Sequence, residues 1–522
     1  MRGAIAAGHP LTAEAGARVL AEGGSAVDAC IAASFASWVT ESMLSGPGAG
    51  GFFLVHEAAS GRTRLADFFV CQPGLGDERR ERTSMQQVDV AFEPDSSQAF
   101  SIGAASCAVP GAPKGLEEVH RRFGRLPWRE LVAPAIELAR SGVEITPAQD
   151  FLHQILDPIL RHNADGRHVF ELEGRRYRAG DLLRHPDLAN TLEQIAAQGA
   201  GALYGGALGR RLVTYIQDEG GGITLQDLER YRVIWRRLVR SRYRGYEFVS
   251  NPPPSSGGIL VAYGLRQLDE LGEGGVPGST EALARLVEVM REQTRARSGN
   301  GYTSRLRRGG LVAKLLSDES VNAALERIRR AVPAGPEPRT ANGTTHISVV
   351  DSCGNAASLT CSLGSSSGVV VPGSGVHLNN MLGEDDLVGG DELPGQRLTS
   401  MMAPSIVFAD GRPRLVLGSA GSVRLRGAIM QTVVNVIGHG LSVEEAVTRA
   451  RVHLDEPVVQ CEGGEDVDPE VLDRLERLGY EIVRWRDRNV FFGGVQAVEV
   501  RADGALAAAG DPRRGGHGVV VE

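Results

Sequence analysis

Lysine is almost missing from this sequence, and so are the spacings of cysteine and histidine that hold metals. Lys occurs only at positions 114 and 314, so nearly all basic residues are Arg, which we attribute to codon composition and not to function. The six cysteines are scattered and form no C-x-x-C pair, which is typical of reduced thiols in a cytoplasmic protein. No His-Glu-x-x-His motif is present, so we expect no metal and no other cofactor.

Long hydrophobic runs are missing as well. The most apolar early stretch, residues 26–39, contains Asp28 and is too short to cross a bilayer. The first residues, MRGAIAAGHPLTAEAG, do not combine a charged leader, an apolar core and a cleavage site, so the pattern predicts no signal peptide and a cytoplasmic location. The formal net charge of −8 disfavours nucleic acids and anionic membranes as partners.

What remains is an ordinary globular composition over a long chain. Of the 522 residues, 42% are hydrophobic and 23% are charged, and the length predicts two domains or one large one. Residues 11–39 have the spacing of two helices, and 108–240 is mostly helical. Strand-like segments dominate from 344 to 420, followed by helices and a final hairpin over 489–514. This order predicts an α+β fold with sheets between helical layers.

A glycine-rich stretch, SGPGAGG, follows the two N-terminal helices. Gly46, Gly48 and Gly51 match the G-x-G-x-x-G spacing of dinucleotide-binding loops. Such a site needs the order strand, glycines, helix, whereas here the order is helix, glycines, strand. We therefore interpret the stretch as a loop at which the backbone approaches another group closely.

The segment ANGTTHISVVD contains a candidate nucleophile, Thr344. A threonine hydroxyl needs a base, and its own α-amino group, with a pKa near ~8, can serve once the preceding bond is cut. Gly343 has no Cβ and permits the strained backbone that an intramolecular attack needs, and the segment 331–343 has the composition of a linker. The alternative is that Thr-Thr-His simply begins a strand, because Thr favours strands.

Motifs along nearly the whole chain resemble the γ-glutamyltransferase (γ-glutamyl transpeptidase) family of N-terminal-nucleophile hydrolases. They include, in the family's order, AAGHPLTAEAGARVLAEGGSAVDA, SGPGAGGFFLVH, VPGAPKGLEEVHRRFGRLPW, PPPSSGGI, TTHISVVDSCGNAASLT, SGVVVPGSGVHLNNMLGE and APSIVFADGRPRLVLGSAG. The resemblance implies a four-layer αββα sandwich. It also implies a precursor that cleaves itself between Gly343 and Thr344 into a large chain, 1–343, and a small catalytic chain, 344–522, which remain associated.

The same resemblance implies catalytic roles for four residues. Thr344 would be both the self-cleaving residue and the nucleophile, and Ser362 stands where the family has a second threonine that hydrogen-bonds the nucleophile. Gly421 and Ser422 match the two residues whose backbone N–H groups form the oxyanion hole, with Ser422 replacing a glycine. The implied partners are a small-molecule acyl donor and a water or amine acceptor, which react through an acyl-enzyme.

The positions that hold the γ-glutamyl group depart from the family pattern. Phe69, in DFFVCQ, stands in the slot of the arginine that binds the substrate α-carboxylate, so an apolar ring replaces a bidentate clamp. Glu384 matches the aspartate that receives the α-ammonium group. The remaining positions of the expected donor pocket are Gly364 in place of Asn, the pair Asn379 and Asn380, Met381 in place of Gln or Glu, Ser400, and Met401 in place of a second serine.

These changes predict an altered acyl-donor specificity and weak turnover of glutathione, because a lost charge-assisted clamp costs about 1.5–3 kcal/mol. Efficient turnover of glutathione would instead require that an arginine from a neighbouring loop replace the lost carboxylate clamp. Two other functions fit the sequence: a carbon–carbon bond hydrolase of this family that makes alkylproline precursors in secondary metabolism, and a catalytically inactive homologue that acts as a binding or scaffold protein. The retained Gly343, Thr344, Ser362 and Gly421 argue against the inactive homologue.

Overall fold

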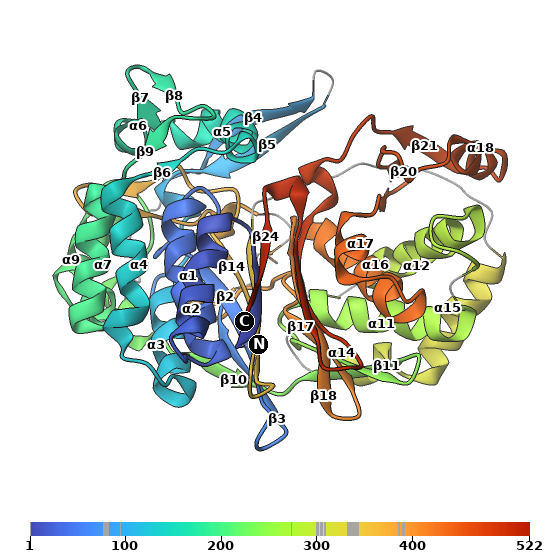
Figure 1. Ribbon diagram of the computed structural model, residues 1–522. Coiled ribbons are helices and arrows are strands. Elements are labelled where there is room, and N and C mark those ends of the chain that lie inside the picture. The colour runs from blue at the N-terminus through green and yellow to red at the C-terminus, as the bar shows by residue number, and fades with distance from the viewer. Residues whose placement is uncertain are drawn as a thin grey trace.

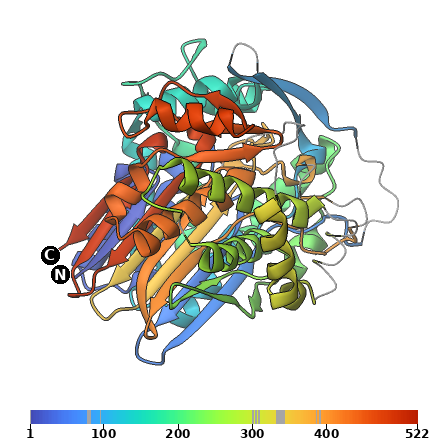
Figure 2. The same cartoon turned by 90° about the vertical axis from the view of Figure 1, so that its right-hand side faces the viewer.

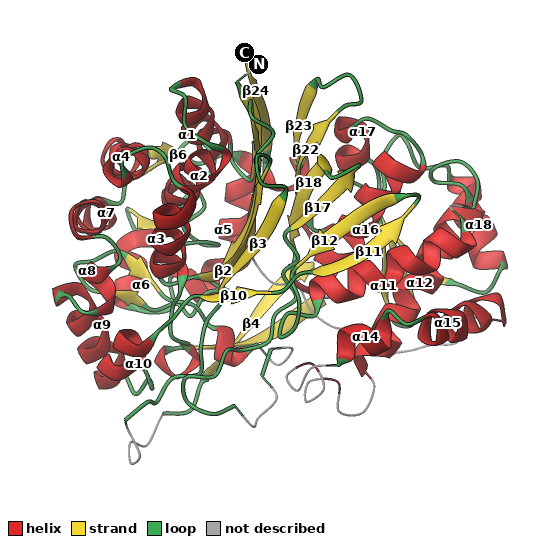
Figure 3. Cartoon of the chain, turned by 90° about the horizontal axis from the view of Figure 1, so that it is seen from below, coloured by secondary structure: helices red, strands yellow, loops and turns green. Residues whose placement is uncertain are grey.

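The computed structural model describes residues 2–76, 83–93, 96–272, 274–298, 302, 306, 310–330, 344–384, 387–388 and 392–522 of the chain. Two large antiparallel sheets pack face to face, and helices cover the outer face of each, as Figure 1 shows from the side and Figure 3 from below. The predicted four-layer αββα sandwich is therefore confirmed. Gly343 and the linker-like segment 331–343 lie outside the described residues.

The first sheet has seven strands, and one of them, β13, begins at Thr345, directly after the candidate nucleophile. The helices α1 (Pro10–Ala21) and α2 (Ala26–Thr40) cover it, with α4 (Trp128–Ser141) and α7 (Pro186–Gln198) outside them in Figure 1. In spatial order the strands are β10 (Ile234–Arg236), β3 (Arg62–Phe68), β2 (Gly50–Glu57), β14 (Ala356–Ser362), β13 (Thr345–Asp351), β1 (Gly3–Ala7) and β24 (His517–Val521).

The second sheet has six strands, covered by α11 (Gly257–Leu271), α16 (Leu425–Val433) and α17 (Val443–Thr448). The first of the helices expected after residue 420 begins as a 3₁₀ turn (Ser422–Arg424) and ends as a π-helical turn (Val434–Gly438), so it is not a regular α-helix along its whole length. In spatial order the strands are β11 (Val239–Tyr243), β12 (Tyr246–Ser250), β17 (Ser405–Ala409), β18 (Arg412–Ala420), β22 (Gly494–Val500) and β23 (Leu506–Gly510).

The remaining elements surround the sandwich. Among them, the hairpin of β4 (Gln86–Glu93) and β5 (Ser96–Ile102) lies beside α5 (Pro147–Leu160) at the top of Figure 1. The other helices are α3 (Ala112–Phe123), α6 (Ala164–Phe170), α8 (Gly201–Tyr204), α9 (Ala207–Asp218), α10 (Leu225–Arg230), α12 (Thr280–Ser298), α14 (Leu311–Leu315), α15 (Asp318–Arg330) and α18 (Pro469–Arg477). The small sheets pair β6 (Val143–Glu144) with β9 (Leu182–Leu183), β7 (Glu171–Leu172) with β8 (Arg175–Arg176), β15 (Val370–Val371) with β16 (Val376–His377), and β19 (Val452–Asp455) with β20 (Val458–Cys461) and β21 (Glu481–Arg484).

Strands from before and after residue 344 alternate in the first sheet. β2 pairs with β14, and β1 lies between β13 and β24, where Gly3 is opposite Val521. The two ends of the described chain are therefore neighbours, as Figure 2 also shows. A buried apolar cluster joins the two sheets, formed by residues such as Phe52, Leu54, Val249, Val350, Ile406, Val416 and Val498. Among the described residues, no helix is both long and apolar enough to cross a membrane.

Candidate active site

The candidate nucleophile lies at the N-terminal end of β13, where Thr344 is only 5% exposed. Its Oγ1 donates a hydrogen bond to the Oγ of Ser362 at 3.4 Å. The antiparallel pairing of β13 with β14, which places Thr345 opposite Cys361, brings the two hydroxyl residues to the same end of the sheet. Ser362 Oγ also accepts a hydrogen bond from the backbone N–H of Gly364 at 2.8 Å. The structure thus brings together three of the sequence-predicted site residues.

Two residues after the candidate nucleophile, His346 fills the space between the two sheets. Its Nδ1 lies 2.8 Å from Thr360 Oγ1, and its Nε2 lies 2.9 Å from Ser348 Oγ. Burial lowers the pKa of His346 to about 3, so the ring is neutral near pH 7. A Cβ on Gly418 of β18 would lie 2.3 Å from the ring, so a glycine is needed for the two sheets to approach here.

The predicted oxyanion turn follows β18. Ser358 Oγ of β14 donates to the carbonyl of Leu417 at 3.2 Å, and Gly418 packs on His346, so β18 runs toward the end of the sandwich that carries Thr344. Gly421 and Ser422 both have left-handed backbones, with φ of 117° and 48°. They open the 3₁₀ turn that leads into α16, where the first N–H groups have no intrahelical acceptor. Two successive amides are thus suited to bind an oxyanion.

The acidic position of the expected donor pocket lies next to the loop after Ser362. Glu384 is buried, and its Oε1 accepts hydrogen bonds from the N–H of Ser365 at 3.2 Å and from its hydroxyl at 3.0 Å. Asn380 Oδ1 accepts from the same N–H at 2.8 Å. A Cβ on Gly364 would lie 2.2 Å from Asn380 Oδ1 and 3.1 Å from Glu384 Oε1, so these three positions are adjacent.

The apolar replacements divide between two clusters. Phe69 is fully buried between the sheets, where its ring stacks on Phe52 at 5.6 Å between centroids, and Met381 belongs to the same cluster. Met401 instead packs with the helices of the second sheet, and its Sδ lies 2.8 Å from Ser256 Oγ at the start of α11. Ser400 accepts a hydrogen bond from the Ser256 N–H through its carbonyl at 2.7 Å.

Asn379 and the glycine-rich loop form scaffold contacts. Asn379 donates from Nδ2 to the carbonyls of Gly48 and Ala108 at 2.8 and 2.9 Å, and its Oδ1 accepts the N–H of Ala108 at 3.1 Å. A Cβ on Gly48 would lie 2.1 Å from the carbonyl oxygen of His377, and one on Gly51 would lie 2.3 Å from that of Thr360. The prediction of a closely approached loop is confirmed.

A family model described as gamma-glutamyltranspeptidase matches residues 12–521 of the chain. The chain belongs to the gamma-glutamyltranspeptidase family. The acylase ACY 1 proenzyme of Pseudomonas sp. (strain SE83) is 33% identical to it, over 100% of this chain and 94% of that protein. The glutathione hydrolase proenzyme of Escherichia coli (strain K12) is 32% identical, over 98% of this chain and 90% of that protein. The chain is therefore a hydrolase of the gamma-glutamyltranspeptidase and acylase family.

Solved structures agree with this assignment. A crystal structure of cephalosporin acylase from Bacillus halodurans matches with a TM-score of 0.83 at 25% identity, over 100% of this chain and 96% of that one. A crystal structure of the Helicobacter pylori gamma-glutamyltranspeptidase matches with a TM-score of 0.53 at 30% identity, over 61% of this chain and 90% of that one. Both support the αββα architecture of the gamma-glutamyltranspeptidase family.

Sequence reasoning missed an arginine beside the family's clamp position. Arg397 is buried, and its Nε lies 3.2 Å from Asp67 Oδ1. Its Nη1 donates to the Phe69 carbonyl and to Cys71 Sγ, and its Nη2 donates to the carbonyls of Asp67 and Arg232. Nη1 and Nη2 of Arg397 are therefore hydrogen-bonded, and Nε, which has no hydrogen-bond partner among the described residues, lies within ion-pair distance of Asp67. Arg79, Arg80 and Arg82 lie outside the described residues.

Glu41, Thr345 and Arg514 were also missed as possible site residues. Thr345, which follows the candidate nucleophile Thr344 in the chain, donates a hydrogen bond from Oγ1 to Glu41 Oε2 at 2.7 Å. The sequence offered two signals: an acidic residue immediately after the apolar helix 26–40, and an arginine at the end of the segment DPRR, residues 511–514.

Proposed function

We propose that the chain is a self-processing N-terminal-threonine hydrolase or acyltransferase that cleaves an amide bond through an acyl-enzyme. The observation that carries this proposal is the hydrogen bond from Thr344 Oγ1 to Ser362 Oγ. Strand β18 runs toward the same end of the sandwich and is followed there by the turn of Gly421 and Ser422. A hydroxyl nucleophile, a hydroxyl that orients it and two backbone amides for the oxyanion are the groups that acyl transfer requires.

The proposed reaction begins with cleavage of the precursor. Thr344 Oγ1 attacks the carbonyl of Gly343, the amide bond becomes an ester, and water hydrolyses the ester to release the α-amino group of Thr344. In each later turnover this amine takes the hydroxyl proton as Oγ1 attacks the donor carbonyl, and the N–H groups of Gly421 and Ser422 stabilise the oxyanion. The proton then passes to the leaving amine, and water or an acceptor amine cleaves the acyl ester on Thr344.

We further propose that the acyl donor is not a typical γ-glutamyl compound. The Phe69 ring lies in the inter-sheet core, and Arg397 is held by Asp67 and backbone carbonyls, so neither offers a carboxylate clamp. Relatives named acylase ACY 1 and cephalosporin acylase support donors of another kind. Glu384 keeps a negative charge beside Gly364, so donors with an amino group and a masked or absent α-carboxylate fit this pocket best.

Two measurements test the proposal. Intact mass should show wild-type protein as chains 1–343 and 344–522, and Thr344→Ala as one uncut, inactive chain. Chromogenic anilides should be compared in pairs that differ only in a free or a methyl-esterified α-carboxylate, with Glu384→Gln expected to weaken the amine-bearing esters and to leave self-cleavage unchanged. Uncut yet active wild-type protein would overturn the nucleophile. A strong preference for the free carboxylate would overturn the proposed donor. The cytoplasmic location stays a prediction.

A further inference from the structure

A buried carboxylate lies directly behind the nucleophile. Glu41, which follows α2, is 6% exposed, and its Oε2 accepts the 2.7 Å hydrogen bond from Thr345. Its Oε1 accepts from Thr12 Oγ1 at 3.4 Å. A Cβ on Gly8 would lie 2.3 Å from Oε2, so Gly8 leaves the space that the carboxylate occupies. Burial raises the pKa of Glu41 to about 7, although the Thr345 hydrogen bond and the charge of Arg514 act in the opposite direction.

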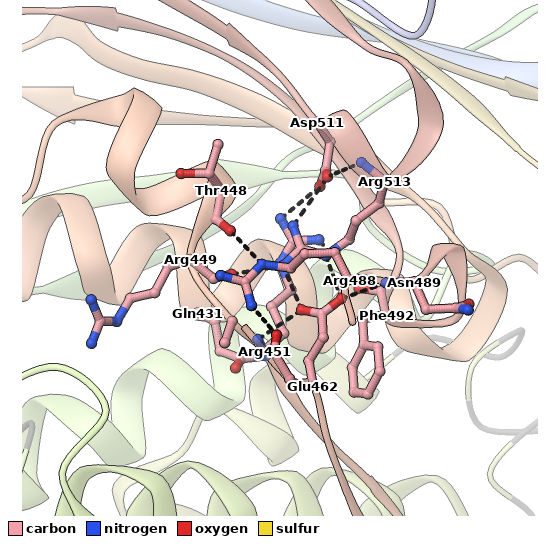
Figure 4. A network of polar contacts seen from close by, with 12 residues as sticks. Gln431, Thr448, Arg449, Arg451, Glu462, Arg488, Asn489, Phe492, Asp511 and Arg513 are labelled. Atoms are coloured by element: carbon pink, nitrogen blue, oxygen red, sulfur yellow. Dashed lines mark hydrogen bonds and ion pairs between the residues drawn. The ribbon is translucent and has the colours of Figure 1, made fainter. Parts of the chain in front are cut away.

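Arg514 carries the opposite charge and lies close enough to Glu41 for each charge to act on the pKa of the other group. It follows Asp511 and Arg513, which are buried in the network of ion pairs in Figure 4, so the 3₁₀ turn Pro512–Arg514 is firmly anchored. A Cβ on Gly494, next to the oxyanion turn, would lie 2.5 Å from Arg514 Cδ. Within the described part of the chain, Arg514 Nε and Nη1 are buried and have no hydrogen-bond partner.

Other titratable groups around Glu41 and Arg514 are neutral or already paired. Burial lowers the pKa of His9, which precedes α1, to about 4, so it carries no charge near pH 7. Asp511 faces Arg514, but it is paired with Arg451 at 2.7 Å and with Arg513 at 3.1 Å. Above about pH 7, where Glu41 is ionised, the charges of Glu41 and Arg514 thus act most directly on Thr345 and on the end of the strand.

The geometry of β13 places the α-amino group of Thr344 near enough to Glu41 and Arg514 for their charges to act on it. Thr345 and Ile347 point toward the helices, whereas His346 points between the sheets, because side chains alternate along β13. The Thr344 side chain therefore lies on the face of Ser362, and Glu41 lies on the opposite face. The backbone nitrogen of Thr344 lies between these faces, one residue from the hydroxyl that holds Glu41.

We propose that Glu41 and Arg514 are positioning residues of opposite charge that together set the protonation of the Thr344 α-amino group, with the Thr345 hydroxyl holding the carboxylate in place. This inference rests on the proposed function, because the amine exists only after cleavage. An anionic Glu41 stabilises the ammonium form and so weakens the base, whereas Arg514 stabilises the neutral amine that accepts the proton.

The test is the acid limb of the pH profile of kcat/KM for the cleaved enzyme. Glu41→Gln keeps an acceptor for Thr345 but removes the negative charge, so the acid limb should move to lower pH by about one unit. Arg514→Gln should move it to higher pH by a similar amount, and the double variant should lie near wild type. Thr345→Val should lower kcat, and Thr345→Ser should restore it.

A merely structural role for these residues predicts a different result. It would lower the thermal stability and the rate of both charge variants without moving their acid limbs in opposite directions, and that outcome would overturn the inference. Intact mass separates the two levels of proposal. Wild-type protein that is not cut at Gly343–Thr344 would overturn the proposed function itself, whereas cut, active variants whose acid limbs coincide would overturn only the roles of Glu41 and Arg514.

Discussion

At the scale of single residues, Ser422 holds a backbone conformation that its side chain disfavours. Its φ of 48° is left-handed, which costs a non-glycine residue roughly 1–2 kcal/mol. Gly421 before it has a φ of 117°, and a Cβ there would lie 2.8 Å from the Cα of Gly493. Such strain persists only where the surrounding structure imposes it, and here it orients two successive amides.

Substitutions at Gly421 and Ser422 should show whether the left-handed backbone of this turn affects stability, catalysis or both. Ser422→Gly removes the strain and keeps the N–H, so the free energy of unfolding should stay level or rise by up to about 1 kcal/mol, with activity close to wild type. Gly421→Ala forces the turn away from Gly493, so kcat should fall by roughly 10²-fold. Thermal unfolding and steady-state kinetics measure both. Full activity in Gly421→Ala would show that this amide does not bind the oxyanion.

Phe69 gives a second test at this scale. Phe69→Arg introduces the arginine that the resemblance implies at this position, but in this structure it places a charge among Phe52, Met381 and other apolar side chains. The free energy of unfolding should therefore fall by about 3 kcal/mol or more, without a gain in γ-glutamyl turnover. Phe69→Leu is the matched control and should be tolerated far better. A stable Phe69→Arg variant with improved γ-glutamyl turnover would show that the side chain at 69 turns toward substrate.

At the scale of elements, regular strands and capped helices were predictable from the sequence. Val443–Thr448 begins with a capping box of Ser442 and Glu445, whose spacing can be recognised in the sequence, and Asp410-Gly411 turns between β17 and β18 with positive φ at both residues. The π-helical end of α16 was not predictable, because it depends on packing and not on local preference. In the candidate site, hydroxyl and glycine positions followed from motifs. The Glu41–Thr345 contact joins residues 304 apart in the chain, which no local pattern reveals.

The buried His346, which lies between β13 and β18, predicts that the protein loses stability at acidic pH. Burial lowers the pKa of His346 from 6.5 to about 3, and that of His377 from 6.5 to about 4. The unfolded chain binds protons at these residues at higher pH than the folded chain does, so stability is lost as the pH falls below about 6.5. The melting temperature should drop between pH 6.5 and pH 4, less steeply in His346→Gln. A flat profile over this range would contradict the buried, neutral rings.

At the scale of the whole molecule, residues before Thr344 and residues from Thr344 onward both contribute strands to each of the two large sheets. In the first sheet, strands of the two parts pair with each other at β2–β14, β13–β1 and β1–β24, and in the second sheet β12 pairs with β17. If the bond before Thr344 is cut, separation would expose strand edges and the apolar core on both chains.

Cleaved protein should therefore behave as one particle. Two bands should appear on a denaturing gel, but size-exclusion chromatography should show a single peak, and the two chains should separate only at urea concentrations that also unfold the sheets. Uncut Thr344→Ala serves as the control of equal mass. Chains that separate in buffer without denaturant would contradict the shared sheets.

Because Gly3 pairs with Val521, the same fold can be formed by a chain whose segments are joined in a different order. Because the backbone on either side of this pair is adjacent, a short loop could join residue 522 to residue 2, and a rearranged gene could then open the circle at Thr344. Such a circular permutant, once trimmed of its initiator methionine, would be synthesised with the nucleophile's amine already exposed, as one continuous polypeptide. Every strand pairing of the sandwich would be preserved, and the cleavage that we propose before Thr344 would no longer be needed.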